Sequence, residues 1–239
     1  WQIKAFRVIH NTETKRIIYE DAFMEFFGVP IAYLPFFSHP DPTVKRQSGF
    51  LLPSFASSTD LGQEITTPYY WAIAPNMDTT IAPRFTSQEG IVYQGEFRHR
   101  IASGAYRFLA TGTWPETRTA GTPGESEFRG SLFGDGRFNI APEWNGGFNA
   151  ELVSDTTYLR KYGLSNVTDL TNRIYVEHFR GRNAITADAY YFKSLLASVN
   201  GDDIPWVAPL VNVDHDFGDI LGDGRLMFNG NMMMLGTPG

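Results

Sequence analysis

The stretch GIVYQGEFRHR, residues 90–100, alternates between two kinds of side chain. Ile91, Tyr93 and Phe97 would fall on one face of an extended chain, and Glu96 and Arg98 would fall on the other. Successive side chains of a β-strand point to opposite faces, so a period of two indicates a strand rather than a helix. We therefore predict a strand with one apolar and one polar face.

The same alternation recurs along most of the chain, and helical periodicity is almost absent. EFRGSLFGDGRFNI, residues 127–140, is the second clear case. Similar segments are 63–74, 76–86, 104–114, 146–154, 184–196, 206–217 and 224–235, with a mixed one at 171–181. Strands in soluble sheets are most often about 5–6 residues long. These segments are longer and match the roughly 9–11 residues of a strand that crosses a bilayer. The sequence predicts an all-β fold.

The lengths of the connections test this interpretation independently. When strands are numbered from Gly49, the long connections are 113–126, 154–172 and 197–205, and each follows an odd-numbered strand. In an up-and-down meander, all such connections lie on one rim. Outer-membrane barrels have long loops on one rim and short turns on the other, whereas a soluble sandwich has no reason for this segregation.

Composition excludes several classes of partner and site. The net charge is −6 and the basic residues are scattered, so we expect no nucleic-acid partner. There is no cysteine, and hence no disulfide or thiolate metal site within these residues. No apolar run approaches the ~18 residues of a membrane-spanning helix.

Residues 1–47 differ from the rest of the chain. Their strand-like segments are less regular, and both faces of FMEFFGVPIAYLPFF, residues 23–37, are rich in apolar residues. That pattern is typical of strands buried on both sides or lining an apolar cavity. We predict a domain boundary near 43–48, in TVKRQS.

Prolines are concentrated around this boundary. Pro35, Pro40 and Pro42 precede it, and Pro53 and Pro68 lie inside the next two strand-like segments. Proline has no N–H for a sheet ladder and is confined to edges, strand starts and bulges. The residues alone favour ordinary bulges at Pro53 and Pro68, and they allow either a stiff hinge or a plain linker at the other three.

No pattern of catalytic or metal-binding residues is present. The five histidines show no H-E-x-x-H spacing, and there is no G-x-S-x-G elbow or P-loop. The aspartates of DHDFGDILGDG, residues 214–224, lack the calcium-loop register and its final glutamate, so we predict a short polar turn there. We expect no enzymatic activity, no cofactor and no metal.

Two longer motifs resemble a known family. VPIAYLPFFSHPDPTVKRQSGFLLPSF, residues 29–55, followed by PYYWAIAPNMDTTIAPRF, residues 68–85, is similar to the LPS-assembly protein LptD family. The resemblance implies that residues 1–47 are the end of a periplasmic jelly roll with its connector. It implies that residues 48–239 are about ten antiparallel strands of an incomplete outer-membrane β-barrel, so that the chain is a fragment. Cysteines that often tie the two domains together in this family are absent.

The resemblance also implies a function and partners. The family inserts lipopolysaccharide into the outer leaflet of the Gram-negative outer membrane, through a jelly-roll path and a lateral barrel gate, with the N-terminal part in the periplasm. The implied partners are lipopolysaccharide, a plug lipoprotein (LptE-like) in the barrel lumen, and a periplasmic bridge protein that binds the missing N-terminal part of the jelly roll.

Roles of individual residues follow from the same likeness. It places the lateral gate at Pro53 and Pro68, and we assign a hinge to Pro35, Pro40 and Pro42. We expect a lipid path from the jelly-roll residues, with plain core packing as the alternative: Ile3, Ala5, Val8, Ile18, Ala22, Met24 and Phe26. The polar barrel face would look into the lumen: Glu64, Asp78, Arg84, Glu96, Arg98 and Arg107.

Two other classes of protein stay open. A porin-like outer-membrane barrel would form a pore without a lateral opening. A soluble β-rich carbohydrate-binding module would cover its apolar strand faces with a second sheet and would need no detergent.

Overall fold

A computed structural model describes residues 2–44, 46–115, 128–222 and 224–237. Contacts divide the chain into two compact units, Trp1–Ser48 and Gly49–Gly239, and each is described on its own. Both are built from antiparallel strands, which confirms the predicted all-β fold. The assignment of the first unit to the end of a jelly roll stays a prediction.

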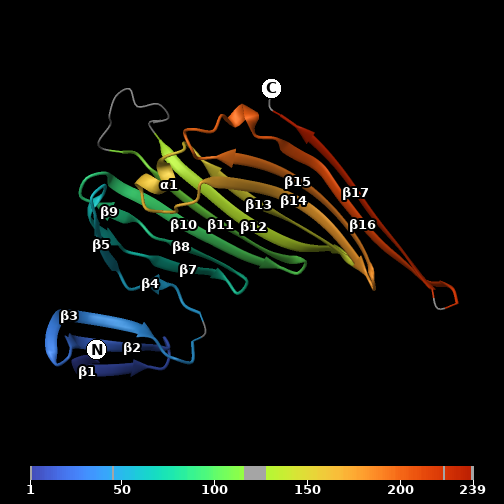
Figure 1. Ribbon diagram of the computed structural model, residues 1–239. Helices are drawn as coiled ribbons and strands as arrows, with labels where there is room; N and C mark the ends of the chain where they lie inside the picture. Colours follow the sequence, from blue (N-terminus) through green and yellow to red (C-terminus); the bar gives the residue numbers. More distant parts are fainter. Residues whose placement is uncertain (1, 45, 116–127, 223, 238–239) are drawn as a thin grey trace. The chain divides into compact units, whose positions relative to one another are not determined.

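The first unit is a three-stranded antiparallel sheet in the order β1-β2-β3 (Figure 1). Its strands are β1 (Gln2–Asn11), β2 (Arg16–Phe26) and β3 (Val29–Pro40). The β2–β3 turn places Phe27 and Gly28 at φ of 49° and 84°, a conformation that glycine adopts without steric cost. Consecutive hairpins therefore place residues of all three strands side by side on each face.

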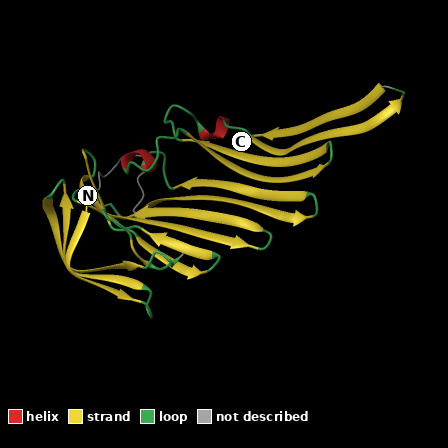
Figure 2. Cartoon of the chain, turned by 90° about the horizontal axis from the view of Figure 1, so that it is seen from below, coloured by secondary structure: helices red, strands yellow, loops and turns green. Residues whose placement is uncertain are grey.

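The second unit is one 14-stranded antiparallel sheet (Figures 1 and 2). The long strands after residue 89 pair with their neighbours along the chain in succession, and the six short strands before it pair as the segments of three interrupted strands. Its strands are β4 (Gly49–Phe50), β5 (Ser54–Ser58), β6 (Gly62–Thr66), β7 (Tyr69–Ala74), β8 (Met77–Ile81), β9 (Arg84–Thr86), β10 (Gly90–Ile101), β11 (Gly104–Thr113), β12 (Arg129–Ala141), β13 (Trp144–Val153), β14 (Asp169–Arg180), β15 (Asn183–Ser194), β16 (Trp206–Leu221) and β17 (Gly224–Gly236). In the described residues the two ends of the sheet do not pair with each other, so the barrel is not closed.

Connections of different length lie on opposite rims of this sheet. The long ones follow β11, β13 and β15, and the tight turns at 102–103, 142–143 and 181–182 lie on the other rim. The short helices α1 (Tyr158–Lys161) and η1 (Gly201–Asp203) belong to the long connections (Figure 1). We call these two rims the loop rim and the turn rim. Most of the predicted loop 113–126 lies outside the described residues.

No described helix has the length and apolar character required to cross a bilayer.

Two predicted loops are shorter than expected. The predicted connection between the segments 127–140 and 146–154 reduces to a turn at 142–143, and β16 continues to Leu221 through most of the predicted turn at 214–224. Register shifts after Asn139 and after Asp216 accommodate the irregular residues within the ladder. A bulge adds a residue to one strand without ending its pairing, which explains why turn-like residues did not end the strands.

One face of the large sheet is polar and is crossed by ion pairs. Arg98 Nε lies 2.7 Å from an oxygen of Asp78, and Arg107 Nη2 lies 2.7 Å from an oxygen of Asp135. The cross-strand register places the residues predicted for a lumen on this face. The buried core of the unit also lies here, where residues 154–168 fold against the sheet: Leu61, Val92, Tyr158, Leu159, Tyr162, Leu170 and Leu195.

The opposite face is apolar and exposed. Ile140, Ile174 and Met232 are 61%, 68% and 59% exposed. Phe108 pairs with Gly134, and a Cβ at this glycine would lie 2.4 Å from the phenylalanine ring. All described strands of the second unit belong to this one sheet, so the unit has no second sheet of its own to cover this face. An apolar surface of this extent marks contact with a partner or with lipid.

Candidate functional site

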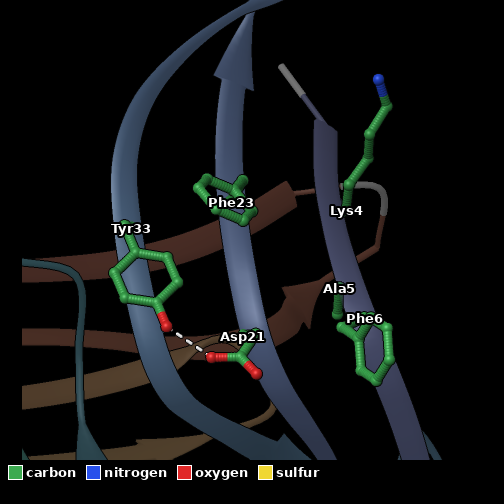
Figure 3. A pocket seen from close by; sticks show the side chains of 6 residues that line it. All are labelled: Lys4, Ala5, Phe6, Asp21, Phe23 and Tyr33. Atoms are coloured by element: carbon green, nitrogen blue, oxygen red, sulfur yellow. Dashed lines mark hydrogen bonds between the residues drawn. The ribbon is translucent and has the colours of Figure 1, made fainter.

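An open groove of about 660 Å³ lies on the three-stranded sheet (Figure 3). All three strands contribute to its lining, which consists of Lys4, Ala5, Phe6, Asp21, Phe23 and Tyr33. Lys4 pairs with Phe23, and Phe23 pairs with Tyr33, so the register alone brings these side chains onto one face.

The groove is apolar along its floor and charged at its margins. The rings of Phe23 and Tyr33 lie 4.9 Å apart, and Phe6 is 89% exposed. The Tyr33 hydroxyl donates a hydrogen bond to Asp21, and Lys4 Nζ lies 2.9 Å from a Glu25 oxygen. The bond to Asp21 raises the pKa of Tyr33. Exposed aromatic rings of this kind favour a hydrocarbon ligand whose polar end meets the margin.

The residues predicted for a lipid path are distributed over both faces of the sheet. Ile3 pairs with Met24, and Ala5 pairs with the fully buried Ala22. Ile18 pairs with Ile9, which lies on the same face as Ile3.

Val8 pairs with Tyr19 on the face of Phe23 and is 56% exposed. Of the predicted set, Ala5 lines the groove, and the side chain of Phe26 lies outside the described part of the structure. The aromatic residues Phe6, Phe23 and Tyr33 were missed. Aromatic residues also recur at the alternate positions of these strands, and this pattern was the signal that could have found them.

The three hinge prolines belong to the end of the first unit. Pro35 and Pro40 lie within β3, an edge strand of its sheet, where a missing N–H is tolerated. Pro42 follows in a turn that Asp41 stabilises, since its Oδ1 accepts from the Thr43 amide at 2.8 Å and the Thr43 hydroxyl at 2.7 Å. These two bonds, together with the neighbouring His10, lower the pKa of Asp41. The hinge role stays a prediction.

Short gaps that contain prolines interrupt three strands of the large sheet at one level. Each strand is thereby divided into two labelled segments: β4 and β5, β6 and β7, and β8 and β9. The gap 51–53 separates β4 from β5, the gap 67–68 separates β6 from β7, and the gap 82–83 separates β8 from β9. The register aligns these gaps, because Thr66 pairs with both Ser54 and Arg84. We call this row of gaps, residues 51–53, 67–68 and 82–83, the seam. It includes Pro53 and Pro68 as predicted positions, and Pro83, which was missed although it stands inside the predicted strand 76–86.

Few backbone hydrogen bonds cross between the strands at the seam. The Leu51 amide donates to the Pro68 carbonyl at 2.8 Å, and the Thr67 amide donates to the Pro83 carbonyl at 3.2 Å. Pro68 and Pro83 accept these bonds, and neither they nor Pro53 has an N–H to donate. By contrast, β10 and β11 pair without a break from Val92 to Ile101. The Ala82 amide also donates to the Gln94 carbonyl at 2.8 Å, so at the seam the pairing between strands rests on single backbone hydrogen bonds rather than on a continuous ladder.

The sheet edge beside the seam presents large apolar side chains. Phe50 and Leu52 are each 80% exposed, and Phe55 is 73% exposed. In the described residues no further strand pairs with β4 and β5 on their outer side. An edge with apolar side chains and unpaired backbone groups accepts either a partner strand or lipid.

No group of three or more His, Asp or Glu side chains in the described ranges is arranged to hold a metal ion.

Comparison with known proteins matches nearly the whole chain to one family. A family model described as "LptD protein" matches residues 17–104, and another, "LPS transport system D", matches residues 127–235. An LPS-assembly protein LptD of Idiomarina loihiensis is 28% identical over 94% of this chain and 26% of its own length. The LptD of Nitrosococcus oceani is 34% identical over 73% of this chain and 23% of its own length. The chain thus spans about a quarter of the length of these curated relatives.

Proposed function

The chain belongs to the LptD family, and on that premise we propose that it takes part in inserting lipopolysaccharide into the bacterial outer membrane. In this proposal residues 1–47 end a periplasmic jelly roll, and residues 48–239 form the first strands of a transmembrane barrel. The role is transport and assembly without catalysis.

The apolar face of the large sheet supports a membrane position. It exposes aliphatic side chains across β12, β14 and β17, while the opposite face is crossed by ion pairs. A strand crosses the roughly 30 Å hydrocarbon core in about 9–11 residues, and β10 to β17 have 10 to 16. A soluble carbohydrate-binding module would cover this face, so the exposed face favours a barrel in the outer membrane of a Gram-negative bacterium.

The groove of the first unit suits the acyl chains of lipopolysaccharide. Burial of hydrocarbon is non-directional and scales with area, so chains slide along a floor of Phe6 and Phe23 without losing specific bonds. Its charged margin, with Lys4, would face the phosphorylated headgroup. A periplasmic bridge protein that reaches the jelly roll would deliver the lipid, and a plug lipoprotein would fill the barrel lumen.

The single observation that carries the proposal is the alignment of the three interruptions in the seam. A lateral exit requires a sheet edge that separates from its partner strand, and each missing donor removes a hydrogen bond worth about 0.5–1.5 kcal/mol net. A general porin needs no such weak edge. We assign the lateral gate to Pro53 and Pro68 and add Pro83 to it.

Photocrosslinking tests this function in the complete protein in living cells. Crosslinking residues at Phe23, in the groove, and at Leu52, beside the seam, should trap lipopolysaccharide during its export. A crosslinker at Glu13, in the exposed β1–β2 turn, is the matched control and should not trap it. Repeated absence of adducts at both Phe23 and Leu52 would rule the transport path out.

A further inference from the structure

Residues 154–165 of the connection between β13 and β14 fold back onto the polar face of the large sheet, and we call them the strap. They include α1, whose Tyr158 and Leu159 are buried, followed by the buried Tyr162. These side chains join the core cluster with Leu61, in the turn before β6, and Val92, on β10. A surface loop would expose them, so the strap is a packed element.

The base of the strap is fixed by a buried ion pair. Arg129, at the start of β12, is fully buried and binds both carboxylate oxygens of Asp155 at 2.6 and 2.9 Å. Arg129 also donates to the Thr157 hydroxyl at 2.6 Å, and its guanidinium lies 5.5 Å from the Tyr162 ring centre. A two-pronged arginine–carboxylate contact sets orientation as well as position. Arg129 therefore aligns the strap on β12.

A second contact fixes the middle of the strap to the neighbouring strand. The Tyr158 hydroxyl lies 2.8 Å from the Thr111 hydroxyl on β11, which in turn lies 2.7 Å from the Ser131 hydroxyl on β12. The strap is thus bonded to two strands that are themselves continuously paired.

The far end of the strap reaches the interrupted strands. Arg84, on β9, donates to the Tyr162 carbonyl at 2.6 Å and pairs with Glu64, on β6, at 3.4 Å. Glu89, in the turn before β10, accepts from the Tyr162 hydroxyl at 3.1 Å and lies 3.1 Å from Lys161 Nζ. These partners all lie on the loop-rim side of the seam, in or beside β5, β6 and β9.

We propose that the strap clamps the loop-rim half of the first three strands to β11 and β12, so that lateral opening bends the sheet at the seam and displaces β4, β7 and β8. Arg129 is the positioning residue of this clamp. The inference rests on the proposed function in so far as it assigns the motion to lipid exit. The clamp itself depends only on contacts within the protein and does not require lipid.

Hydrogen exchange of the complete protein in detergent, without lipopolysaccharide, tests the clamp. Asp155→Asn removes the ionic bond that holds the base of the strap. Amides of β5, β6 and β9 should then exchange about tenfold faster or more, because local opening free energy falls when a buried pair is broken, while β7 and β8 keep their rates. Asp135→Asn is the matched control, since Asp135 pairs with Arg107 on the same face but both side chains are more than half exposed. It should change none of these rates.

A milder variant keeps the test decisive if Asp155→Asn does not fold. Tyr162→Phe retains the ring and removes only the bond to Glu89, so it should accelerate the same amides by a smaller factor. Unchanged rates in β6 and β9 despite faster exchange of the strap would overturn the clamp, as would equal acceleration in β7 and β8. A failed crosslink at Leu52 would instead reject the lipid exit and leave these rates as they are, so the two failures are distinguishable.

Discussion

The Leu51 amide donates to the carbonyl oxygen of Pro68 at 2.8 Å, and this bond links the first interrupted strand to the second within the seam. The donor comes from the edge strand and the acceptor comes from a residue that cannot return a bond. At this level the edge strand donates a backbone hydrogen bond to its neighbour, and Pro68 returns none. An edge held in this way separates more easily than one held by a full ladder.

Restoring donors in the seam should slow lipid export. We expect Pro53→Ala with Pro68→Ala to reduce export, and the addition of Pro83→Ala to reduce it further, because each new N–H strengthens pairing by about 0.5–1.5 kcal/mol where it finds an acceptor. The measurement is the rate at which newly made lipopolysaccharide reaches the cell surface. Pro142→Ala, in the turn between β12 and β13, is the control and should leave the rate unchanged. Equal export by the triple variant and the wild type would show that the prolines are plain bulges.

The groove should be sensitive to charge. Phe6→Glu places a carboxylate on an apolar floor, and burying it against acyl chains carries a large desolvation cost, so export should fall severalfold. Val29→Glu makes the same change at a residue that is 61% exposed and does not line the groove. It should export normally. A normal rate for Phe6→Glu at wild-type protein level would exclude the groove from the lipid path.

Packing on the apolar face predicts a large difference between two glycines. A Cβ at Gly134 would lie 2.4 Å from the Phe108 ring, whereas a Cβ at Gly95 meets nothing within 4 Å. Gly134→Ala should therefore destabilise the sheet by about 1–3 kcal/mol through overpacking. Gly95→Ala should be neutral or slightly stabilising. The midpoint of denaturant unfolding in detergent measures both, and equal midpoints would show that Phe108 moves aside without cost.

Much of the fold could be predicted from the sequence because the two faces of each strand meet different surroundings. That contrast produces the alternation at 90–100 and locates most strands of the large sheet. The interruptions at Pro53, Pro68 and Pro83 were harder to interpret, because their alignment depends on register between strands, and register is not visible in one segment.

The strands of residues 1–47 carry apolar side chains on both faces, and this explains why the groove was missed. Alternation separates Ile3 and Met24 from Phe6 and Phe23, but nothing local decides which set binds a ligand. The strap shows a different limit. Arg129 and Asp155 lie 26 residues apart, and no local pattern pairs a charge in β12 with one in a later loop.

Protonation of Asp155 should release the strap at low pH. Burial would raise the pKa of this carboxyl, but hydrogen bonds from Arg129, Thr157 and Ser154 outweigh it and lower the pKa from 3.8 to about 2. A lowered folded-state pKa stabilises the strap above the unfolded value, and this stabilisation is lost as the pH falls from about 4 towards 2. Pepsin cleavage near Tyr158 and Leu159, measured relative to cleavage in the 195–205 connection, should therefore rise in that interval and stay level above it. Asp155→Asn removes the titrating group and should abolish the rise, whereas a constant ratio in the wild type from pH 4 to 2 would contradict the role of the ion pair.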